Sequence, residues 1–209
     1  MWIAIEGPDR VGKKTQAAML ANAISAAGIR VSQVEVPYYG YGAAWSYSMI
    51  YSMLASGAAK RWPLVFQLVH MLNKLACQLH LMLGCADVAV LDRWHMSSVV
   101  YGIASGVNRL AVRAMGMLLA KPTVTIVLLK RKQHPGDEAP DSYESDAQLQ
   151  DRVRLLYGSM CDGDSIIAID ADGTREEVAQ RIRCAVNPHL KRANHYIFNE
   201  LTDEEQLNG

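Results

Sequence analysis

A glycine-bounded loop near the N-terminus carries the residues best suited to grip phosphate. The segment from Gly7 to Lys13 reads GPDRVGK and matches the pattern G-x-x-x-x-G-K of the phosphate-binding loop. Its glycines let backbone N–H groups turn inward around phosphate oxygens, and the N-terminus of a following helix adds partial positive charge. Lys13 would then bridge the β- and γ-phosphates of a nucleotide. The alternative is an ordinary glycine turn whose lysine is solvated.

The residue after this lysine departs from the pattern. A serine or threonine that binds magnesium normally follows, whereas here Lys14 stands in that place and the hydroxyl comes at Thr15. Because successive residues of a helix diverge by about 100°, Thr15 does not simply replace the missing ligand. Either magnesium is held by water and carboxylates, or activity is weakened. A degenerate, non-catalytic nucleotide binder is therefore a second interpretation.

Two Asp-Arg pairs supply further charge for phosphate chemistry. Asp9 and Arg10 lie inside the loop, whereas Asp92 and Arg93 follow a short apolar run. Arginine can stabilise charge on a migrating phosphoryl group, and its planar guanidinium suits bidentate phosphate binding. Since ligands of open α/β sheets bind beyond the carboxyl ends of strands, the second pair is expected at such an end. The alternatives are an exposed cation for Arg10 and a structural ion pair for the second set.

The elements that must position these groups alternate between strands and helices. Strands are predicted at 1–6, 30–36, 87–91, 123–129 and 165–170. Helices are predicted at 15–27, 44–55, 63–83, 110–120, 147–157 and 174–186. This alternation, with neither an internal repeat nor an interdomain linker, predicts one α/β domain whose central parallel sheet is flanked by helices.

Composition narrows the classes of function. Lysine plus arginine and aspartate plus glutamate both number 21, so the formal net charge is zero. This balance argues against a groove for polymeric nucleic acid. The four cysteines form no C-x-x-C pair and no secretory leader is recognised, so we expect a reduced, intracellular protein, placed in the cytoplasm. No apolar run reaches the roughly 18 residues of a membrane span, so no membrane partner is predicted.

Four blocks of sequence carry a resemblance to a known family. They are IEGPDRVGKKTQ (5–16), VFQLVHMLNK (65–74), LDRWHMSSVVYG (91–102) and DSYESD (141–146). In this order they resemble blocks of the thymidylate kinases: E-G-x-D-x-x-G-K-S/T-T-Q, F-Q-x-x-x-x-x-N-R, D-R-Y/W/H-x-x-S-x-x-A/V-Y and the lid signature D-R-Y-E. The virus-like and phage-like members are the most similar, so the cytoplasm would be that of a host if the protein is viral.

The resemblance implies a fold and a domain organisation. The expected fold is the three-layer P-loop NTPase fold with a short lid. The thymidylate-kinase-like domain would cover 1–187, with the lid at about 130–146, and a polar C-terminal extension would follow at 188–209. Family members usually form homodimers, so a second copy of the chain is an expected partner.

The resemblance also implies a reaction. It predicts a nucleoside monophosphate kinase that transfers the γ-phosphate of ATP to dTMP, giving dTDP and ADP, with Mg²⁺ as cofactor. Because the second pKa of a phosphate is about 6, the acceptor oxygen is already largely ionised and no general base is required. Two alternatives remain, namely a kinase for a modified pyrimidine such as 5-hydroxymethyl-dUMP and a catalytically degenerate nucleotide-binding protein.

Site residues follow from the same resemblance. The expected catalytic residues are Lys13, Arg10, Arg93 and Asp9. The expected ATP-binding residues are Gly7, Arg10, Val11, Gly12, Lys13, Lys14, Thr15 and Arg131. The expected acceptor-binding residues are Asp9, Tyr38, Phe66, His70, Asn73, Lys74, Arg93, Ser97, Ser98 and Tyr101. Magnesium is assigned to Asp9 and Asp92.

Some of these roles are specific. Phe66 is expected to stack on the base, and the pair Asn73–Lys74 to read the base edge. Lys74 stands where the family has arginine, and it offers a point charge rather than a fork. Tyr101 is expected to crowd the 2′ position of the sugar, the alternative being a buried tyrosine with a satisfied hydroxyl. Because Ser142 replaces the arginine of the lid signature, the cation that stabilises the transition state is expected from Arg10.

Overall fold

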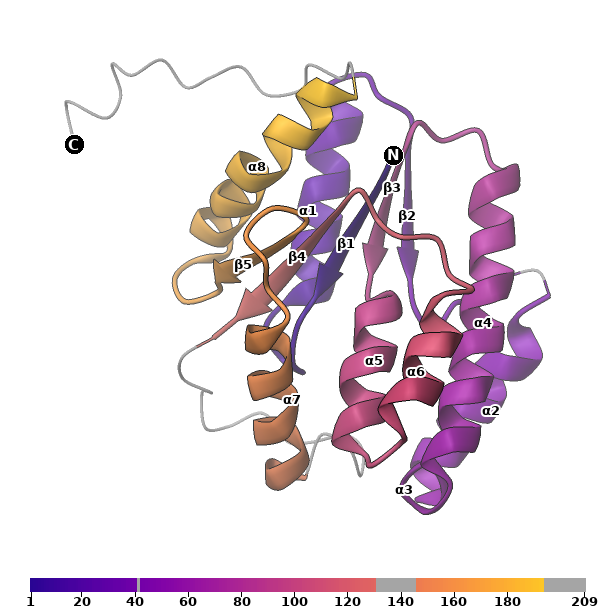
Figure 1. Ribbon diagram of the computed structural model, residues 1–209. Coiled ribbons are helices and arrows are strands. Elements are labelled where there is room, and N and C mark those ends of the chain that lie inside the picture. Colours follow the sequence, from indigo (N-terminus) through magenta and orange to yellow (C-terminus); the bar gives the residue numbers. More distant parts are fainter. Residues whose placement is uncertain (41, 131–145, 194–209) are drawn as a thin grey trace.

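Five parallel strands form the centre of the computed structural model, which describes residues 1–40, 42–130 and 146–193 (Figure 1). The strands are β1 (Trp2–Glu6), β2 (Val31–Glu35), β3 (Val88–Asp92), β4 (Val124–Leu129) and β5 (Ile166–Asp170). Their order across the sheet is β2-β3-β1-β4-β5. The three inner strands are buried almost throughout. Strands of parallel sheets are covered on both faces, so their sequences are near-continuous apolar runs.

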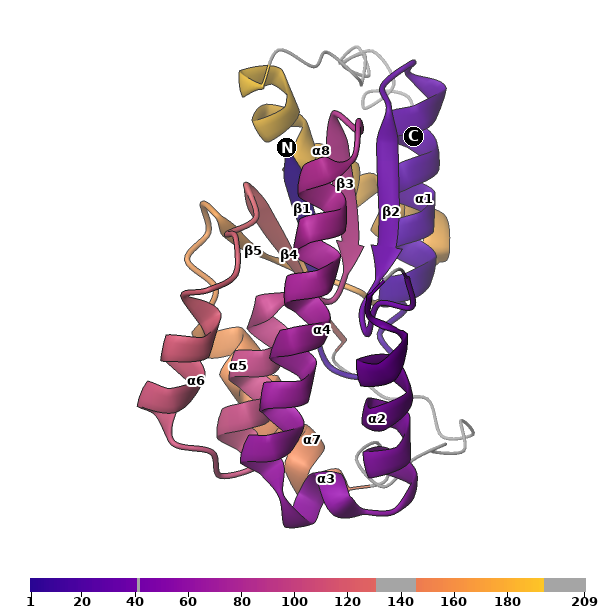
Figure 2. The same ribbon diagram turned by 90° about the vertical axis from the view of Figure 1, so that its right-hand side faces the viewer.

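Helices cover both faces of this sheet. One face is covered by α1 (Lys13–Ala26) and α8 (Arg175–Arg192), which lie side by side (Figure 1). The other face is covered by α4 (Pro63–Leu83), α5 (His95–Ala104) and α7 (Ala147–Ser159) (Figure 2). The remaining described helices are α2 (Ala44–Ala55), α3 (Ala58–Arg61) and α6 (Arg109–Gly116). The result is the three-layer α/β arrangement that the sequence predicts.

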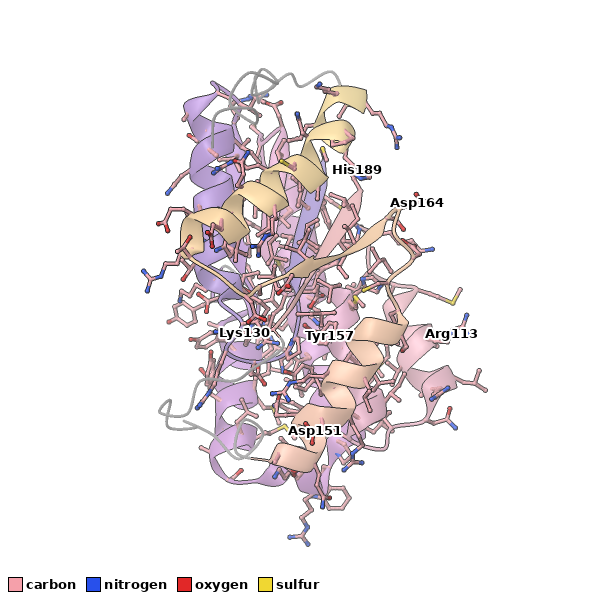
Figure 3. The ribbon with its side chains drawn as sticks, turned by 90° about the vertical axis from the view of Figure 1, so that its left-hand side faces the viewer. Arg113, Lys130, Asp151, Tyr157, Asp164 and His189 are labelled. Carbon is pink, nitrogen blue, oxygen red and sulfur yellow. The ribbon has the colours of Figure 1, made fainter. Side chains whose placement is uncertain are left out.

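Alternate side chains of the strands pack on opposite faces of the sheet. Ile3 and Ile5 of β1 pack against α1 and α8, whereas Ala4 between them faces the cluster that contains Cys77 of α4. This alternation follows from the two-residue repeat of a strand. Asp151 lies on the outer surface of α7, exposed to solvent (Figure 3).

The register of the sheet brings three acidic residues to one edge. Glu35 at the end of β2 lies opposite Asp92 at the end of β3, and Ile5, next to Glu6, also lies opposite Asp92. The carboxyl ends of these strands therefore share one edge, toward which α2, α5 and α7 extend (Figure 1). Sites of open α/β sheets form at such edges.

Two predicted boundaries need correction, and the sequence does not predict α3 or α5. The helix predicted at 110–120 ends at Gly116, and α8 continues through Pro188 to Arg192. A domain boundary at 187 therefore falls inside a helix, and Leu190 beyond it is fully buried in the core. The predicted lid lies almost entirely outside the described residues. No helix among the described residues is long and apolar enough to cross a membrane.

Candidate active site

The phosphate loop joins the end of β1 to the start of α1. Gly7 has φ 140°, and a Cβ at this position would collide with the backbone carbonyl oxygen of Leu128 on β4. Gly12 has φ 87° and immediately precedes α1. Among the described residues no side chain caps α1. The first N–H groups of the helix are therefore available for an anion such as phosphate.

Lys13 lies folded back over its own loop. Its side chain is buried, at 6 % exposure, and Nζ donates a hydrogen bond to the backbone carbonyl of Pro8. Burial lowers the pKa of Lys13 to about 7, and the nearby charge of Arg93 acts in the same direction. A bound phosphate would oppose both effects, because it favours the charged form of the amine.

Asp9 is the point where the loop meets the rest of the site. Its carboxylate forms an ion pair with Arg93 and accepts hydrogen bonds from Tyr101 Oη at 2.6 Å and Gln150 Nε2 at 2.9 Å. Burial alone would raise the pKa of Asp9, but Arg93, Lys13 and the two hydrogen bonds lower it to about 2. Asp9 is therefore ionised throughout the physiological range.

Arg93 carries the second charge of this pair. It follows β3 directly and adopts a left-handed backbone with φ 69°. Its guanidinium lies 5.6 Å from the ring centroid of Tyr101, close enough for a cation–π contact. The sequence predicts both Arg93 and Asp9 as catalytic residues, and the structure brings them into contact.

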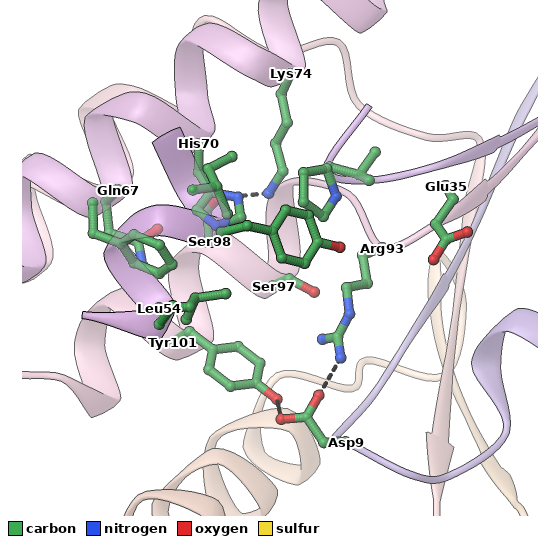
Figure 4. A pocket seen from close by; sticks show the side chains of 16 residues that line it. Asp9, Glu35, Leu54, Gln67, His70, Lys74, Arg93, Ser97, Ser98 and Tyr101 are labelled. Carbon is green, nitrogen blue, oxygen red and sulfur yellow. Dashed lines mark hydrogen bonds and ion pairs between the residues drawn. The ribbon is translucent and has the colours of Figure 1, made fainter. Parts of the chain in front are cut away.

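A cavity of about 550 Å³ opens beside this pair. Ligand pockets usually measure about 300–1,000 Å³, so a nucleotide-sized ligand fits. Charged residues occupy one end, namely Asp9, Glu35 and Arg93, and polar residues occupy the other, namely Gln67, His70, Lys74 and Ser98 (Figure 4). Apolar side chains such as Ile50, Leu54 and Phe66 line the walls between them.

One stripe of α4 provides much of the polar end. Phe66, His70 and Lys74 are four residues apart, so they share a face of the helix. The rings of Phe66 and His70 meet edge to face, with centroids 4.6 Å apart. Burial lowers the pKa of His70 to about 3, so this ring is neutral at physiological pH. The cavity therefore offers a flat aromatic wall beside polar groups.

Lys74 is almost fully buried at this end of the cavity. Its Nζ donates hydrogen bonds to the carbonyl of Trp94 and to Ser98 Oγ, both at 2.6 Å. Burial lowers the pKa of Lys74 to about 8. Of the two predicted serines, Ser98 is held by Lys74, while Ser97 Oγ donates to the buried carboxylate of Glu6. Both serines line the cavity.

Two predicted acceptor residues do not line the cavity. The Asn73 side chain accepts from the N–H of Tyr38 at 2.7 Å and donates to its carbonyl at 2.9 Å and to Ser46 Oγ at 3.1 Å. The ring of Tyr38 stacks on His80, with centroids 5.3 Å apart. The prediction that Asn73 reads the base edge is corrected accordingly, because its amide holds the loop after β2 instead.

The residues after Lys13 point away from the loop. Lys14 Nζ forms an ion pair with Glu35 at 2.6 Å, and both side chains are more than half exposed. Such surface pairs contribute about 0–1 kcal/mol. Thr15 is exposed. Within the loop itself, Val11 packs against the hydrophobic core on the face of the sheet that α1 and α8 cover. Arg10 has φ 65° within the loop, and Arg131 lies outside the described residues.

The described carboxylates offer few ligands for a magnesium ion. Asp92 is buried, its Oδ1 has no hydrogen-bond partner among the described residues, and burial raises its pKa. Asp9, the other predicted ligand, is already engaged by three side chains. No group of three or more His, Cys, Asp or Glu residues in the described part of the chain could hold a metal. These features fit Mg²⁺, which usually keeps several waters and binds through substrate phosphates.

Sequence reasoning missed three residues that lie behind the site, and none of them lines the cavity. Glu6, fully buried at the end of β1, accepts hydrogen bonds from Trp94 N–H at 2.8 Å and Ser97 N–H at 3.1 Å. Tyr157 of α7 donates to the same carboxylate at 3.2 Å (Figure 3). Gln150 of α7 contacts Asp9. Of these three residues, only Glu6 could have been recognised from the sequence. A carboxylate at the end of an apolar strand is buried, and it then needs hydrogen-bond partners.

Comparison with known proteins finds relatives that match most of the chain. A family model described as thymidylate kinase matches residues 5–182. A thymidylate kinase of Rhizorhabdus wittichii is 30 % identical over 200 residues, which cover 87 % of this chain and 94 % of the relative. One of Mycobacterium tuberculosis is 29 % identical over 195 residues, covering 77 % of this chain and 85 % of the relative.

A solved structure supports the fold. The thymidylate kinase of Candida albicans superposes with a TM-score of 0.70 over 92 % of both chains, at 21 % identity. The sheet, the loop between β1 and α1, and the family match over most of the length lead to one conclusion. The chain belongs to the thymidylate kinase family.

Proposed function

We propose that this protein transfers the γ-phosphate of ATP to dTMP and releases dTDP and ADP. The observation that carries the proposal is the contact between Asp9 of the phosphate loop and Arg93 at the charged end of the cavity. This contact brings a donor site and an acceptor site side by side, as a direct transfer between two nucleotides requires.

The donor would occupy the loop from Gly7 to Lys13. Backbone N–H groups and the start of α1 would surround its phosphates, and Lys13 would leave the Pro8 carbonyl to contact them. Magnesium, when bound with ATP, would neutralise charge on the phosphates, and Asp92, whose Oδ1 has no hydrogen-bond partner among the described residues, would contact its water shell. The chain's own cations, Lys13 and Arg93, add to this neutralisation.

The acceptor would lie along the cavity. Its phosphate would face Arg93, its sugar would pass Tyr101 and Asp9, and its base would rest against Phe66 and His70. Because the acceptor phosphate is already largely ionised at neutral pH, alignment and charge neutralisation suffice for catalysis. Nothing in the comparisons favours a modified pyrimidine over dTMP.

The homodimer also stays a proposal. Leu64, Val65, Leu68 and Leu72 of α4 are each at least 40 % exposed, and they form an apolar strip at helical spacing. A second copy of the chain would cover this strip. Sedimentation velocity on the wild type and on Leu68→Glu would test it, since the charge should favour the monomer, and an unchanged dimer would reject this surface.

The reaction is tested by incubating the protein with ATP, Mg²⁺ and one nucleoside monophosphate at a time. The panel is dTMP, dUMP, dCMP, dAMP, dGMP and UMP, with ADP and diphosphate products separated by chromatography. We expect dTMP to give the highest kcat/KM and UMP a low one, because Tyr101 limits space beside the sugar. ATP binding without ADP formation from any acceptor would reject the proposal and favour a degenerate nucleotide binder.

A further inference from the structure

The backbone of Arg93 is held in a conformation that an arginine rarely adopts. Its φ of 69° lies in the left-handed region, where the Cβ of an L-residue crowds the following carbonyl. Such a conformation persists only where neighbouring contacts over-determine it. One contact lies on its N-terminal side, where the N–H of Arg93 donates to the carbonyl of Ile5 at 2.9 Å.

The next residue, Trp94, is fixed through its side chain. The indole is fully buried, its Nε1 donates to the carbonyl of Ala120 at 2.9 Å, and its ring meets Trp2 edge to face. An anchored indole limits sideways movement of the chain here. It does not by itself set the orientation of the two peptide groups that flank Trp94.

A carboxylate holds the first of these peptide groups. Glu6 Oε1 accepts the N–H of Trp94 at 2.8 Å and the N–H of Ser97 at 3.1 Å. Glu6 therefore caps the start of α5 from a distant part of the chain. The bond is charge-assisted, and the negative charge lies at the positive end of the helix dipole.

An ammonium group holds the second peptide group. Lys74 Nζ donates to the carbonyl of Trp94 at 2.6 Å and to Ser98 Oγ at 2.6 Å. The side chain descends from α4 and ends beside the cavity (Figure 4). Glu6 and Lys74 thus come from different elements, and each bonds the main chain of Trp94.

We propose that Glu6 and Lys74 are positioning residues that hold the N–H and the C=O of Trp94 and thereby keep Arg93 in its left-handed conformation. That conformation directs the guanidinium toward Asp9 and the phosphoryl group. The inference rests on the proposed function, and it gives Lys74 a role other than reading the base. Glu6 does not line the cavity, so it has no means of contacting the acceptor.

The test uses Glu6→Gln and Lys74→Met in the full-length protein, with Tyr157→Phe as the matched control. Tyr157 bonds the other oxygen of Glu6 rather than the main chain of Trp94, so its loss perturbs the same carboxylate without releasing the peptide groups. We expect kcat to fall by about 10- to 100-fold in the two test variants, since displacing a catalytic group by about 1 Å has that effect. KM for ATP should stay near the wild-type value, and Tyr157→Phe should keep kcat near wild type.

Crystal structures of the two test variants give a readout that does not depend on activity. We expect Arg93 to leave the left-handed region and its ion pair with Asp9. Retention of both in both variants would overturn the inference, whatever the rates. A raised KM for dTMP at unchanged kcat in Lys74→Met would overturn it too, because it would mark Lys74 as a base reader. A wild type without kinase activity would instead reject the proposed function, while the backbone of Arg93 would still test the inference.

Discussion

The donor loop and the acceptor cavity are built from different parts of the chain. The loop spans residues 7–13, all of which except Pro8 have a backbone N–H, and its shape depends on Gly7 and Gly12. The cavity presents side chains that come from α2, α4, α5 and the ends of β2 and β3. Side-chain substitutions in the cavity should therefore change dTMP binding without changing ATP binding. Only residues that contact both regions should change the rate of phosphoryl transfer itself.

Arg93→Ala is expected to have the largest effect, because Arg93 lies where the two regions meet. We expect kcat to fall about 10³-fold or more, as loss of an arginine that stabilises a phosphoryl transition state does. The fold should stay intact, since the guanidinium is part-exposed. Steady-state kinetics and thermal denaturation would measure both effects.

The control for this variant is Arg113→Ala, which removes an exposed cation of α6 (Figure 3) that does not line the cavity. Its kcat should match the wild type. Normal turnover in Arg93→Ala would remove Arg93 from the mechanism and leave the two regions without a shared catalytic group.

The pH dependence of ATP binding isolates the donor loop. The free protein has Lys13 with a pKa of about 7, whereas a bound triphosphate favours its charged form. Above pH 7 binding must therefore take up a proton, and Kd for ATP should rise by up to about tenfold per pH unit. Calorimetry at pH 8 in buffers of different ionisation enthalpy would count the protons.

Lys13→Met is the control for this measurement, since it should abolish the proton uptake as well as weaken ATP binding. The affinity for dTMP should show no matching slope, because Lys13 does not line the cavity. Absence of proton uptake at pH 8 in the wild type would contradict the buried, partly neutral state of this lysine.

Phe66→Leu isolates the acceptor cavity. The substitution keeps an apolar side chain but removes the flat ring, so KM for dTMP should rise about tenfold, equivalent to about 1.4 kcal/mol. KM for ATP should not change in the same variant, which provides an internal control. An equal rise in both constants would mean that Phe66 supports the fold rather than the base.

Lys14→Ala is expected to have the smallest effect, because Lys14 contacts the cavity only through its exposed ion pair with Glu35. The ion pair with Glu35 is exposed on both sides, so thermal stability should change little and kcat should stay within about twofold of wild type. Lys14→Thr, which restores the usual hydroxyl, provides the comparison and should also leave kcat near wild type. A gain of about tenfold or more in the kcat of Lys14→Thr would instead show that the missing hydroxyl limits magnesium use.

The same contrast explains what could be predicted from the sequence. The phosphate loop was predictable because its glycines and lysine act through local backbone geometry. The five strands were predictable as short apolar runs. By contrast, α5 begins at His95 without a local capping residue and contains Ser97 and Ser98, which are weak helix formers. Its cap is Glu6, which lies far earlier in the chain, so no local pattern could reveal it.

The cavity was predictable only in part for a similar reason. Helical spacing places Asn73 on the same stripe as Phe66 and His70, but in the structure its amide holds the loop after β2 and Lys74 lines the cavity instead. The contact between Gln150 and Asp9 spans 141 positions and has no signature in either segment. Residues that act through such distant contacts become visible only in three dimensions.

The continuation of α8 past Pro188 has a practical consequence for anyone who shortens the gene. Leu190 is fully enclosed together with Ile24 and the strand residues on that face of the sheet. An expression vector that stops at position 187 would delete Leu190 and leave a cavity in the core beneath α8. Keeping the codons through Arg192 would preserve the last turn of α8 and keep this apolar surface covered.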